Sequence, residues 1–483
     1  MDKATSKNII FNMIKTISSI VFPIITFPYV ARVLGAENVG KVNYSDSIVS
    51  YFSLIATLGI TTYAVRESSK VRDDKEKLNL IVSELLSINI ITTIISYLLL
   101  FLTLFFVPFL HPYVTIILIQ SISMIFSVIG ADWLNSAMED FKYITIRTFM
   151  FQVFSLVSLF LFVRKKEDYF YYVIITLIAH SGANLLNFFY RRRYCAPKFT
   201  FQMQWKKHLK PIMLLFAMLI SQTLLNNMDI SMLGFMKSDY DVGLYSTAYR
   251  VINIISQLVT SIAWVVMPQL TIAFQEINYK KINMLLEEIV SVTCFLGIPC
   301  VMGIIVYAKE IVLVIGGKEY AGAAICLQIL AISMLISFFG GIIGNMIFLP
   351  SGRDKRFMVA CICATIVNLL CNLIVIPRFG IEGASVATVI SSLVIFVILY
   401  TGIEREIHLS VSGIKNALVG PLIEAIVIVV LGRIFGYLFD NWVVSLIVGI
   451  TSSIVLYPII LILCKNKKAL EILNHIRQTR RTK

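Results

Sequence analysis

The sequence predicts an all-α membrane protein with about fourteen transmembrane helices, arranged as two seven-helix lobes related by an internal repeat. Three observations predict this fold class: the chain is 58% hydrophobic with a mean hydropathy of +0.84, apolar runs recur along it, and one long polar break divides those runs into equal halves. A soluble chain of 483 residues could not hide so much apolar surface in one core. The bilayer is therefore the expected solvent for most side chains.

Each apolar run is long enough to cross a bilayer, which takes about 20 residues of helix for about 30 Å of hydrocarbon. Because a backbone in lipid must satisfy its own hydrogen bonds, and because these runs are continuous rather than alternating, helices are predicted and barrel strands are not. In chain order the predicted spans are 9–31, 42–65, 80–107, 113–136, 145–163, 169–190, 211–235, 245–270, 285–308, 320–349, 357–376, 382–402, 415–437 and 442–464.

The first run is expected to be a retained span, because it follows Lys3 and Lys7 and leads to no small-residue cleavage site. The longest interior polar break, 191–210, separates the first seven spans from the last seven. We therefore predict an N-terminal lobe over 1–210, a C-terminal lobe over 211–464 and a basic cytoplasmic tail over 465–483.

A short internal repeat supports the two lobes. Near the end of the first span stands Val-Leu-Gly at 33–35, followed by Val39-Gly40 and then Tyr-Ser at 44–45. Near the end of the seventh span stands Met-Leu-Gly at 232–234, followed by Val242-Gly243 and then Tyr-Ser. Two halves that begin with the same helix, turn and helix indicate a duplicated transporter with a substrate path between the halves, although a chance similarity of Leu-Gly turns is the alternative.

The basic residues predict the orientation. Thirty of the 42 Lys and Arg residues fall on one set of alternate loops and nine on the other, with Lys15, Arg250 and Arg433 inside spans. Because basic residues concentrate on the cytoplasmic side, both termini are predicted to be cytoplasmic. The net charge of +14 is explained by this orientation, and no nucleic-acid-binding motif accompanies it.

Polar residues inside four spans recur at helical spacing and so lie on stripes. Such stripes indicate either a hydrated cavity in the bundle or amides that join helices by hydrogen bonds. The stripes include Asn12 and Lys15, Asn226 and Asp229, Arg250 and Asn253, and Asn368 and Asn372.

The charged members favour the cavity, because a charge inside a span is costly unless it faces protein or water. Arg250 and Asp229 are predicted to line it, whereas Lys15 could still reach the cytoplasmic interface. Arg32, Arg147 and Asp132 lie nearer span ends, where contact with lipid headgroups explains them nearly as well.

Sequence motifs for chemistry are missing. The chain contains no GxxxxGK[ST] loop, no HExxH pair and no nucleotide-binding glycine fingerprint, and its eight cysteines form no CxxC motif. We therefore predict no ATP site, metal or cofactor, and a protein that is not an enzyme.

Four segments in order resemble the bacterial polysaccharide repeat-unit flippases, which belong to the superfamily of multidrug, oligosaccharidyl-lipid and polysaccharide exporters. They are the segment 27–35 with 58–60 and 66–67, then Asp-Trp-Leu at 132–134 with 139–147, then 350–355, and then 377–384. The resemblance covers nearly the whole chain. It implies two lobes, alternating access and transport rather than catalysis.

The resemblance also implies a cargo: an undecaprenyl-diphosphate-linked oligosaccharide, turned from the cytoplasmic to the outer leaflet of the bacterial inner membrane for O-antigen, capsule or exopolysaccharide synthesis. A diphosphate needs cations away from water, and sugars need amides. The candidates are Lys15, Arg32, Arg147 and Arg250 for the diphosphate, and Asn12, Asn226, Asn253, Asn368 and Asn372 for the sugars.

Without an ATP site, energy would come from an ion gradient or from consumption of product outside, and Asp229 is the candidate coupling residue. Polysaccharide polymerase and chain-length proteins are possible partners, besides membrane lipids. The alternatives are a drug or lipid-precursor exporter of the same superfamily, a membrane polymerase, which should carry larger outer loops, and a scaffold subunit.

Overall fold

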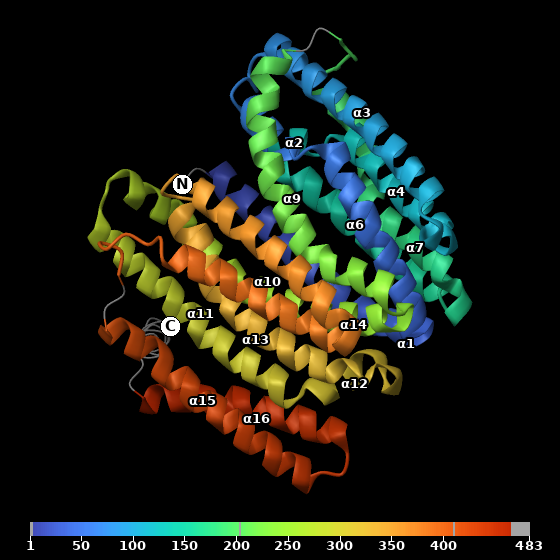
Figure 1. Ribbon diagram of the computed structural model, residues 1–483. Helices are drawn as coiled ribbons and strands as arrows, with labels where there is room; N and C mark the ends of the chain where they lie inside the picture. The colour runs from blue at the N-terminus through green and yellow to red at the C-terminus, as the bar shows by residue number, and fades with distance from the viewer. Residues whose placement is uncertain (1–2, 202–203, 409–410, 465–483) are drawn as a thin grey trace. The chain divides into compact units, whose positions relative to one another are not determined.

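The computed structural model describes residues 3–201, 204–408 and 411–464, shown in Figure 1. Within these ranges the side chains of 3–10, 12–17, 20, 205–206, 214, 218, 262, 411–412, 414 and 416 lie outside the description. Every regular element of the described residues is helical, which confirms the all-α class. The chain divides into two compact units, Met1–Gly243 and Leu244–Lys483.

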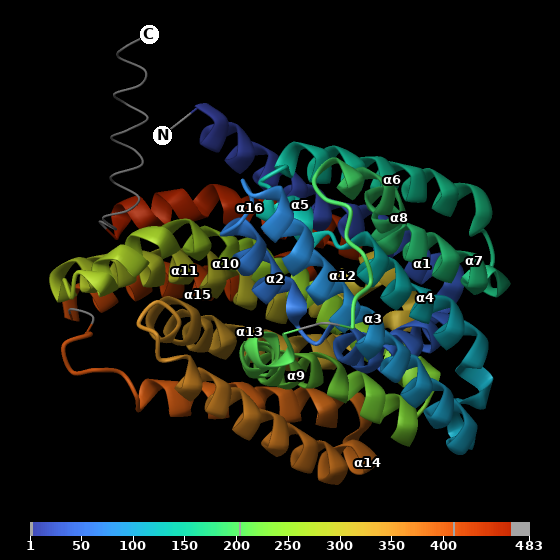
Figure 2. The same ribbon diagram turned by 90° about the horizontal axis from the view of Figure 1, so that it is seen from above.

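The first unit is built around α1, which contacts α3, α4, α6 and α9 (Figure 1 and Figure 2). A π-helical turn at Ile178–Gly182 joins α7 to α8, so that these two helices form one span. Its helices are α1 (Lys3–Thr57), α2 (Ile60–Ser69), α3 (Lys75–Phe106), α4 (Val114–Gly130), α5 (Trp133–Ala137), α6 (Phe141–Phe162), α7 (Tyr169–Leu177), α8 (Ala183–Tyr190) and α9 (Trp205–Met236).

The second unit is organised by two close helix pairs, α11 with α15 and α13 with α14. Helix α10 (Asp239–Gln275) begins in the first unit and continues into the second. The other helices are α11 (Tyr279–Val306), α12 (Ala308–Gly316), α13 (Ala323–Gly341) with a π-helical end at Ile342–Phe348, α14 (Asp354–Tyr400), α15 (Val411–Leu438) and α16 (Trp442–Leu463).

Eleven helices of the described residues are long and apolar enough to cross a membrane, or up to twelve if a bent pair, Asp239–Ser261 with Ala263–Gln275, is one span. Two of them, Val21–Ser69 and Asp354–Tyr400, hold 49 and 47 residues. Straight helices of that length would extend about 70 Å, more than twice a hydrocarbon layer of about 30 Å.

Both long helices are in fact broken, at Gly35 (φ 76°) and Gly380 (φ 55°). A positive φ suits glycine because it has no Cβ. Both glycines lie in gaps that the sequence predicts between consecutive spans. Each long helix therefore crosses twice, and with the bent pair counted as one span the described helices give the fourteen predicted spans.

The segment before α9 is held along α3 by an alternating ladder. The backbone N–H groups of 196, 198 and 200 donate to Asn79 Oδ1, Ser83 Oγ and Ser87 Oγ at 2.8, 3.0 and 3.0 Å. Two extended residues advance about 6.6 Å and four helical residues about 6.0 Å, so every second N–H meets every fourth helical side chain. The ladder fixes where α9 begins.

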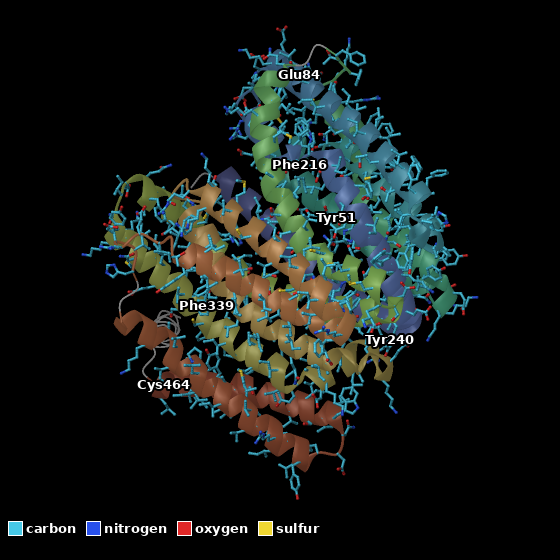
Figure 3. The ribbon with its side chains drawn as sticks, in the orientation of Figure 1. Tyr51, Glu84, Phe216, Tyr240, Phe339 and Cys464 are labelled. Carbon is cyan, nitrogen blue, oxygen red and sulfur yellow. The ribbon has the colours of Figure 1, made fainter. Side chains whose placement is uncertain are left out.

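A buried polar trio reinforces this junction. His208 Nε2 lies 2.8 Å from Glu84 Oε2, and Tyr63 OH lies 2.9 Å from His208 Nδ1, which joins α2, α3 and α9. All three side chains are almost fully buried, and Figure 3 labels Glu84 near the start of α3. Buried polar groups need such partners, so the trio ties the first turn of α9 to this unit.

Helix α9, the seventh predicted span, packs against α1 and α2 and belongs to the first compact unit. The contact boundary therefore lies at Gly243, 33 residues beyond the predicted lobe boundary at residue 210. A sequence repeat shows where the second copy of a duplicated unit begins, whereas packing shows which helices contact one another. A helix that begins the second repeat can therefore still pack on the helices before it. The division at residue 210 stays a prediction.

Candidate functional site

A buried arginine lies in the second turn of α6. Ala131 ends α4 in a left-handed conformation (φ 47°), which turns the chain just before Asp132. Arg147 is only 4% exposed, and its Nη2 lies 2.5 Å from Asp132 Oδ1. The guanidinium carbon also lies 5.2 Å from the centre of the Tyr143 ring, within range of a cation–π interaction.

Two nitrogens of the same guanidinium donate no hydrogen bond to the described residues. Nε and Nη1 of Arg147 are buried and have no hydrogen-bond partner among the described residues. Leaving charged donors unmet away from water is costly. Because Nε and Nη1 are donors on a charged group and each can reach an acceptor oxygen, Arg147 is suited to hold an anion.

Two buried amides hold Asp132 in place. Asn135 Nδ2 donates to Asp132 Oδ1 at 3.2 Å and to Asn187 Oδ1 at 2.7 Å. Asn187 Nδ2 donates in turn to the carbonyl oxygen of Gly130 at 2.6 Å. This network links the ends of α4, α5 and α8, so the arginine and its counter-ion are pre-positioned.

Asp140 forms a second polar cluster beside the first. It caps α6 by accepting the N–H of Tyr143 at 3.2 Å, and it accepts the hydroxyls of Tyr190 and Tyr194 at 2.7 and 2.6 Å. Burial alone would raise the pKa of Asp140, but the hydrogen bonds from Tyr194, Tyr190 and the Tyr143 N–H outweigh it and lower the pKa. The folded protein therefore favours the charged form.

This lowered pKa predicts a pH-dependent stability. A carboxyl whose folded pKa lies below its unfolded value, about 3.9, stabilises the fold above that value, and the contribution is lost as the pH falls through the folded pKa. Asp140→Asn is expected to destabilise the protein by about 1–3 kcal/mol at neutral pH, and this difference should shrink in acid. Thermal unfolding from about pH 7 to about pH 3, with Asp73→Asn as the exposed control, measures it. A constant difference across that range would contradict the assignment.

The predicted coupling residue, Asp229, is buried on α9 at 3% exposure. It lies within electrostatic range of Tyr51, which Figure 3 labels on α1. Tyr51 OH lies 2.9 Å from Ser231 Oγ, which donates to Ser47 Oγ at 3.0 Å. A chain of hydroxyls thus runs between α1 and α9 beside the carboxyl.

The other predicted site residues differ in exposure. Arg32 on α1 and Asn226 on α9 are exposed, whereas Arg250 and Asn253 on α10 are half-buried. The structure brings one predicted pair together, because Asn372 Nδ2 donates to Asn368 Oδ1 at 3.1 Å on α14. The side chains of Asn12 and Lys15 lie outside the described residues.

The repeated Val-Gly turns meet each other. A β-carbon on Gly40 would lie 1.7 Å from the carbonyl oxygen of Asp239, and one on Gly243 would lie 1.9 Å from the carbonyl oxygen of Ala36. Real β-carbons do not approach oxygen so closely, so both positions require glycine. Tyr113 OH also donates to Asp239 Oδ1 at 2.7 Å. The two turns form a reciprocal backbone contact, on the side predicted to face outward.

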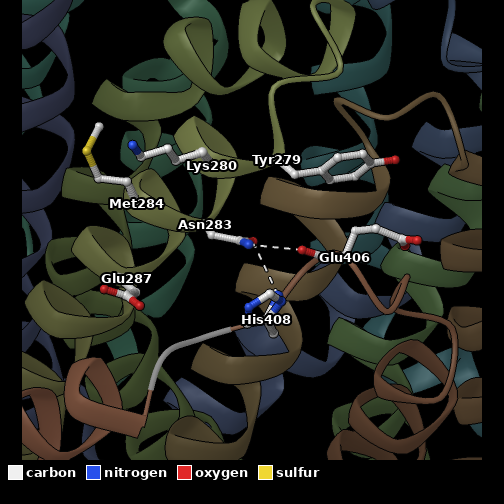
Figure 4. A pocket seen from close by; sticks show the side chains of 7 residues that line it. All are labelled: Tyr279, Lys280, Asn283, Met284, Glu287, Glu406 and His408. Atoms are coloured by element: carbon white, nitrogen blue, oxygen red, sulfur yellow. Dashed lines mark hydrogen bonds between the residues drawn. The ribbon is translucent and has the colours of Figure 1, made fainter.

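A pocket of about 590 Å³ lies in the second unit, at the first turns of α11 (Figure 4). Asn283 Nδ2 donates to the carbonyl oxygen of Glu406 at 2.9 Å, and the N–H of His408 donates to Asn283 Oδ1 at 3.2 Å. The lining residues are Tyr279, Lys280, Asn283, Met284, Glu287, Glu406 and His408.

Sequence reasoning missed three titratable residues. Glu84, His208 and Glu424 are each buried to 2% exposure or less. Glu84 and Glu424 stand inside predicted spans, so the rule that singled out Asp229 could have found them. His208 precedes its predicted span and carries no such signal.

The fold and these intramembrane polar sites define a multi-pass membrane protein. The chain belongs to the family described as polysaccharide biosynthesis protein, which it matches over residues 5–274. It is 29% identical over 243 residues to a probable low-salt glycan biosynthesis flippase of Haloferax volcanii, in an alignment that covers 49% of this chain and about half, 50%, of that protein. It is 23% identical over 408 residues to the capsular polysaccharide biosynthesis protein CapF of Staphylococcus aureus, covering 83% of this chain and 99% of that protein.

Among solved structures, the fold is similar to that of the lipid II flippase MurJ in its inward closed conformation. The TM-score is 0.73 at 18% sequence identity, covering 94% of this chain and 98% of that chain. At this identity the likeness defines the fold, which is the predicted bundle of two repeated lobes.

Proposed function

We propose that this protein is a flippase for undecaprenyl-diphosphate-linked oligosaccharide repeat units. It would move them from the cytoplasmic to the outer leaflet of a bacterial inner membrane, where they serve O-antigen, capsule or exopolysaccharide synthesis. Family membership supports the polysaccharide role. Both termini would lie in the cytoplasm, on the side where Lys and Arg concentrate.

The observation that carries this proposal is the guanidinium of Arg147, buried with two nitrogens that no described residue satisfies. A diphosphate offers several acceptor oxygens and negative charge, which suits those donors. Arg32, Arg250 and Lys15 are proposed to hold or guide the same group elsewhere on its path. Asn226, which is exposed, and Asn253, which is half-buried, are proposed to contact the sugars, as are Asn12, Asn368 and Asn372 if the bundle opens there.

The reciprocal contact of Gly40 and Gly243 supports alternating access. Two backbones in direct contact exclude cargo and water at that point. We propose that this contact is closed while cargo enters from the cytoplasm and opens for release outward.

Asp229 is proposed to couple transport to an ion gradient, because a buried carboxyl in a span can exchange a proton or a cation. Asp229→Asn is expected to keep the fold and to lose the stimulation of flipping by an imposed gradient. Flipping in proteoliposomes, with and without an ionophore, measures it. An unchanged response to the ionophore would exclude Asp229.

A drug exporter of the same superfamily is the alternative. A site built from unmet guanidinium donors favours an anionic cargo over a cationic drug, which would be repelled by Arg147.

The deciding experiment follows lipid-linked repeat units in a strain that lacks this chain. We expect them to accumulate in the inner leaflet while surface polysaccharide is lost, and expect the wild-type chain to restore both. An unaltered leaflet distribution, together with a new sensitivity to cationic drugs, would favour the drug exporter.

A further inference from the structure

One carboxyl group inside α15 has no hydrogen-bond partner among the described residues. Glu424 lies eighth in the candidate span Ala417–Leu438 and is 1% exposed. Neither Oε1 nor Oε2 has a hydrogen-bond partner among the described residues. Seven residues of helix place it about 10 Å inside that span.

The surroundings of Glu424 are apolar and uncharged. The buried face of α15 around it carries Ala417 and Ala425, which pack with Cys294 and Ile298 of α11. From α13 the same cluster receives Leu335 and Phe339.

No cation lies close on the same helix. Lys415 and Arg433 are each nine residues from Glu424, about 13 Å along the axis. Tyr457 of α16 is within electrostatic range of Glu424, and Cys294 and Cys300 of α11 are within range of Tyr457. Phenol and thiol groups are neutral at physiological pH, so none of these groups can balance the negative charge of a carboxylate.

An unpaired carboxylate in this position would cost several kcal/mol. A carboxylic acid avoids that cost, because it is neutral. Glu424 is therefore a protonated acid in the conformation described, and it can ionise only when water reaches it.

A line of small residues on α15 leads from Glu424 toward the pocket of Figure 4. Gly413, Ala417, Gly420 and Glu424 follow one another on one face of α15, at steps of four, three and four. A β-carbon on Gly413 would lie 2.7 Å from the carboxyl carbon of Glu287, which also lines the pocket of Figure 4. The pocket thus lies at the end of a seam of small residues, about 16 Å from Glu424 along the helix.

We propose that Glu424 is a proton-binding site of the transport cycle, loaded in the described conformation and released through the α11–α15 seam toward the pocket that contains Glu287. On release the O–H bond of the acid breaks, the carboxylate keeps the electron pair, and a water molecule in the seam takes the proton. The transport part rests on the proposed flippase function and deepens its ion coupling by naming a proton and a second residue besides Asp229.

Infrared spectroscopy of the full-length protein in lipid nanodiscs tests the protonation state without any cargo. We expect a carbonyl-stretch band of a protonated, apolar carboxyl at neutral pH, shifted in deuterium oxide, and lost in Glu424→Gln. The exposed matched control, Glu276→Gln, should keep the band. A spectrum from which Glu424→Gln removes no part of this band would overturn the proposal.

Glu424→Leu provides a second variant if the glutamine does not fold, because an apolar side chain suits this apolar site. It should also lose the band and unfold at or above the wild-type temperature. A Glu424→Leu protein with the undiminished wild-type band overturns the proposal equally.

The coupling is tested in proteoliposomes with an imposed proton gradient. We expect the gradient to stimulate flipping by the wild type, and expect Glu424→Gln to flip down a cargo gradient with no such stimulation. A full response in Glu424→Gln would overturn the coupling role even if the band is lost. If the wild type moves no lipid-linked cargo, the proposed function fails, whereas the infrared result still decides whether Glu424 binds a proton.

Discussion

Gly40→Ala is expected to lower the flipping rate by about 5- to 150-fold, because overpacking of a close contact typically costs about 1–3 kcal/mol. The added β-carbon would lie 1.7 Å from the carbonyl oxygen of Asp239 and 3.0 Å from the backbone nitrogen of Gly243. Both are backbone atoms, so no flexible side chain can give way. The repeated turns would have to separate, and the closed state would be disfavoured.

The matched control is Gly303→Ala in α11, where an added β-carbon meets nothing within 4 Å. It adds the same methyl group and should flip like the wild type. Flipping of a fluorescent lipid-linked oligosaccharide in proteoliposomes gives the rates, and thermal unfolding confirms that both variants fold. A Gly40→Ala protein with the wild-type rate would show that this contact does not have to close during transport.

Arg147→Lys is expected to lower binding of a lipid-linked diphosphate by about 10- to 150-fold, although the positive charge remains. A lysine cannot present donors in the fixed directions of the guanidinium Nε and Nη1, and each hydrogen bond to a charged group contributes about 1.5–3 kcal/mol. The stabilisation of the purified protein by undecaprenyl diphosphate, followed as a shift in unfolding temperature, measures the loss.

Asp132→Asn separates anion binding from a purely structural ion pair. It removes the carboxylate that lies 2.5 Å from Arg147 but leaves the guanidinium in place. If Arg147 holds the diphosphate, Asp132→Asn should keep ligand-induced stabilisation while Arg147→Lys loses it. An equal loss of ligand-induced stabilisation in both variants would indicate that the ion pair of Arg147 and Asp132 has only a structural role. Arg72→Lys, which alters the exposed pair with Glu139, is the control for an arginine outside the site.

The fold was predictable because each span depends on neighbours in sequence. The two breaks at Gly35 and Gly380 fall within predicted gaps, where the local apolar runs end. The junction before α9 was not predictable in the same way. Its ladder pairs residues more than 110 positions apart, such as Ala196 with Asn79. A hydropathy profile cannot predict which distant residues form such a hydrogen bond.

The candidate site was predicted in part. Arg147 and Asp229 were found because charges in or near spans are rare, and both prove to be buried. Glu84 and Glu424 also stand inside predicted spans, so the rarity of charges in spans marks them in the same way. Nothing in the sequence distinguishes them from each other, although Glu84 has His208 as its partner and Glu424 has none among the described residues.

The sequence by itself determined the membrane class, the number of spans, the repeated turns and the family to which the chain belongs, because these follow from composition and from short motifs. Only the tertiary structure decided which polar groups are satisfied. Among the described residues Arg147 keeps two unmet nitrogens and the carboxyl of Glu424 has no partner, while Gly40 and Gly243 touch. The physical reason is that hydropathy is a sum over adjacent residues, whereas a hydrogen bond or a clash depends on the distance between atoms that the folded chain brings together.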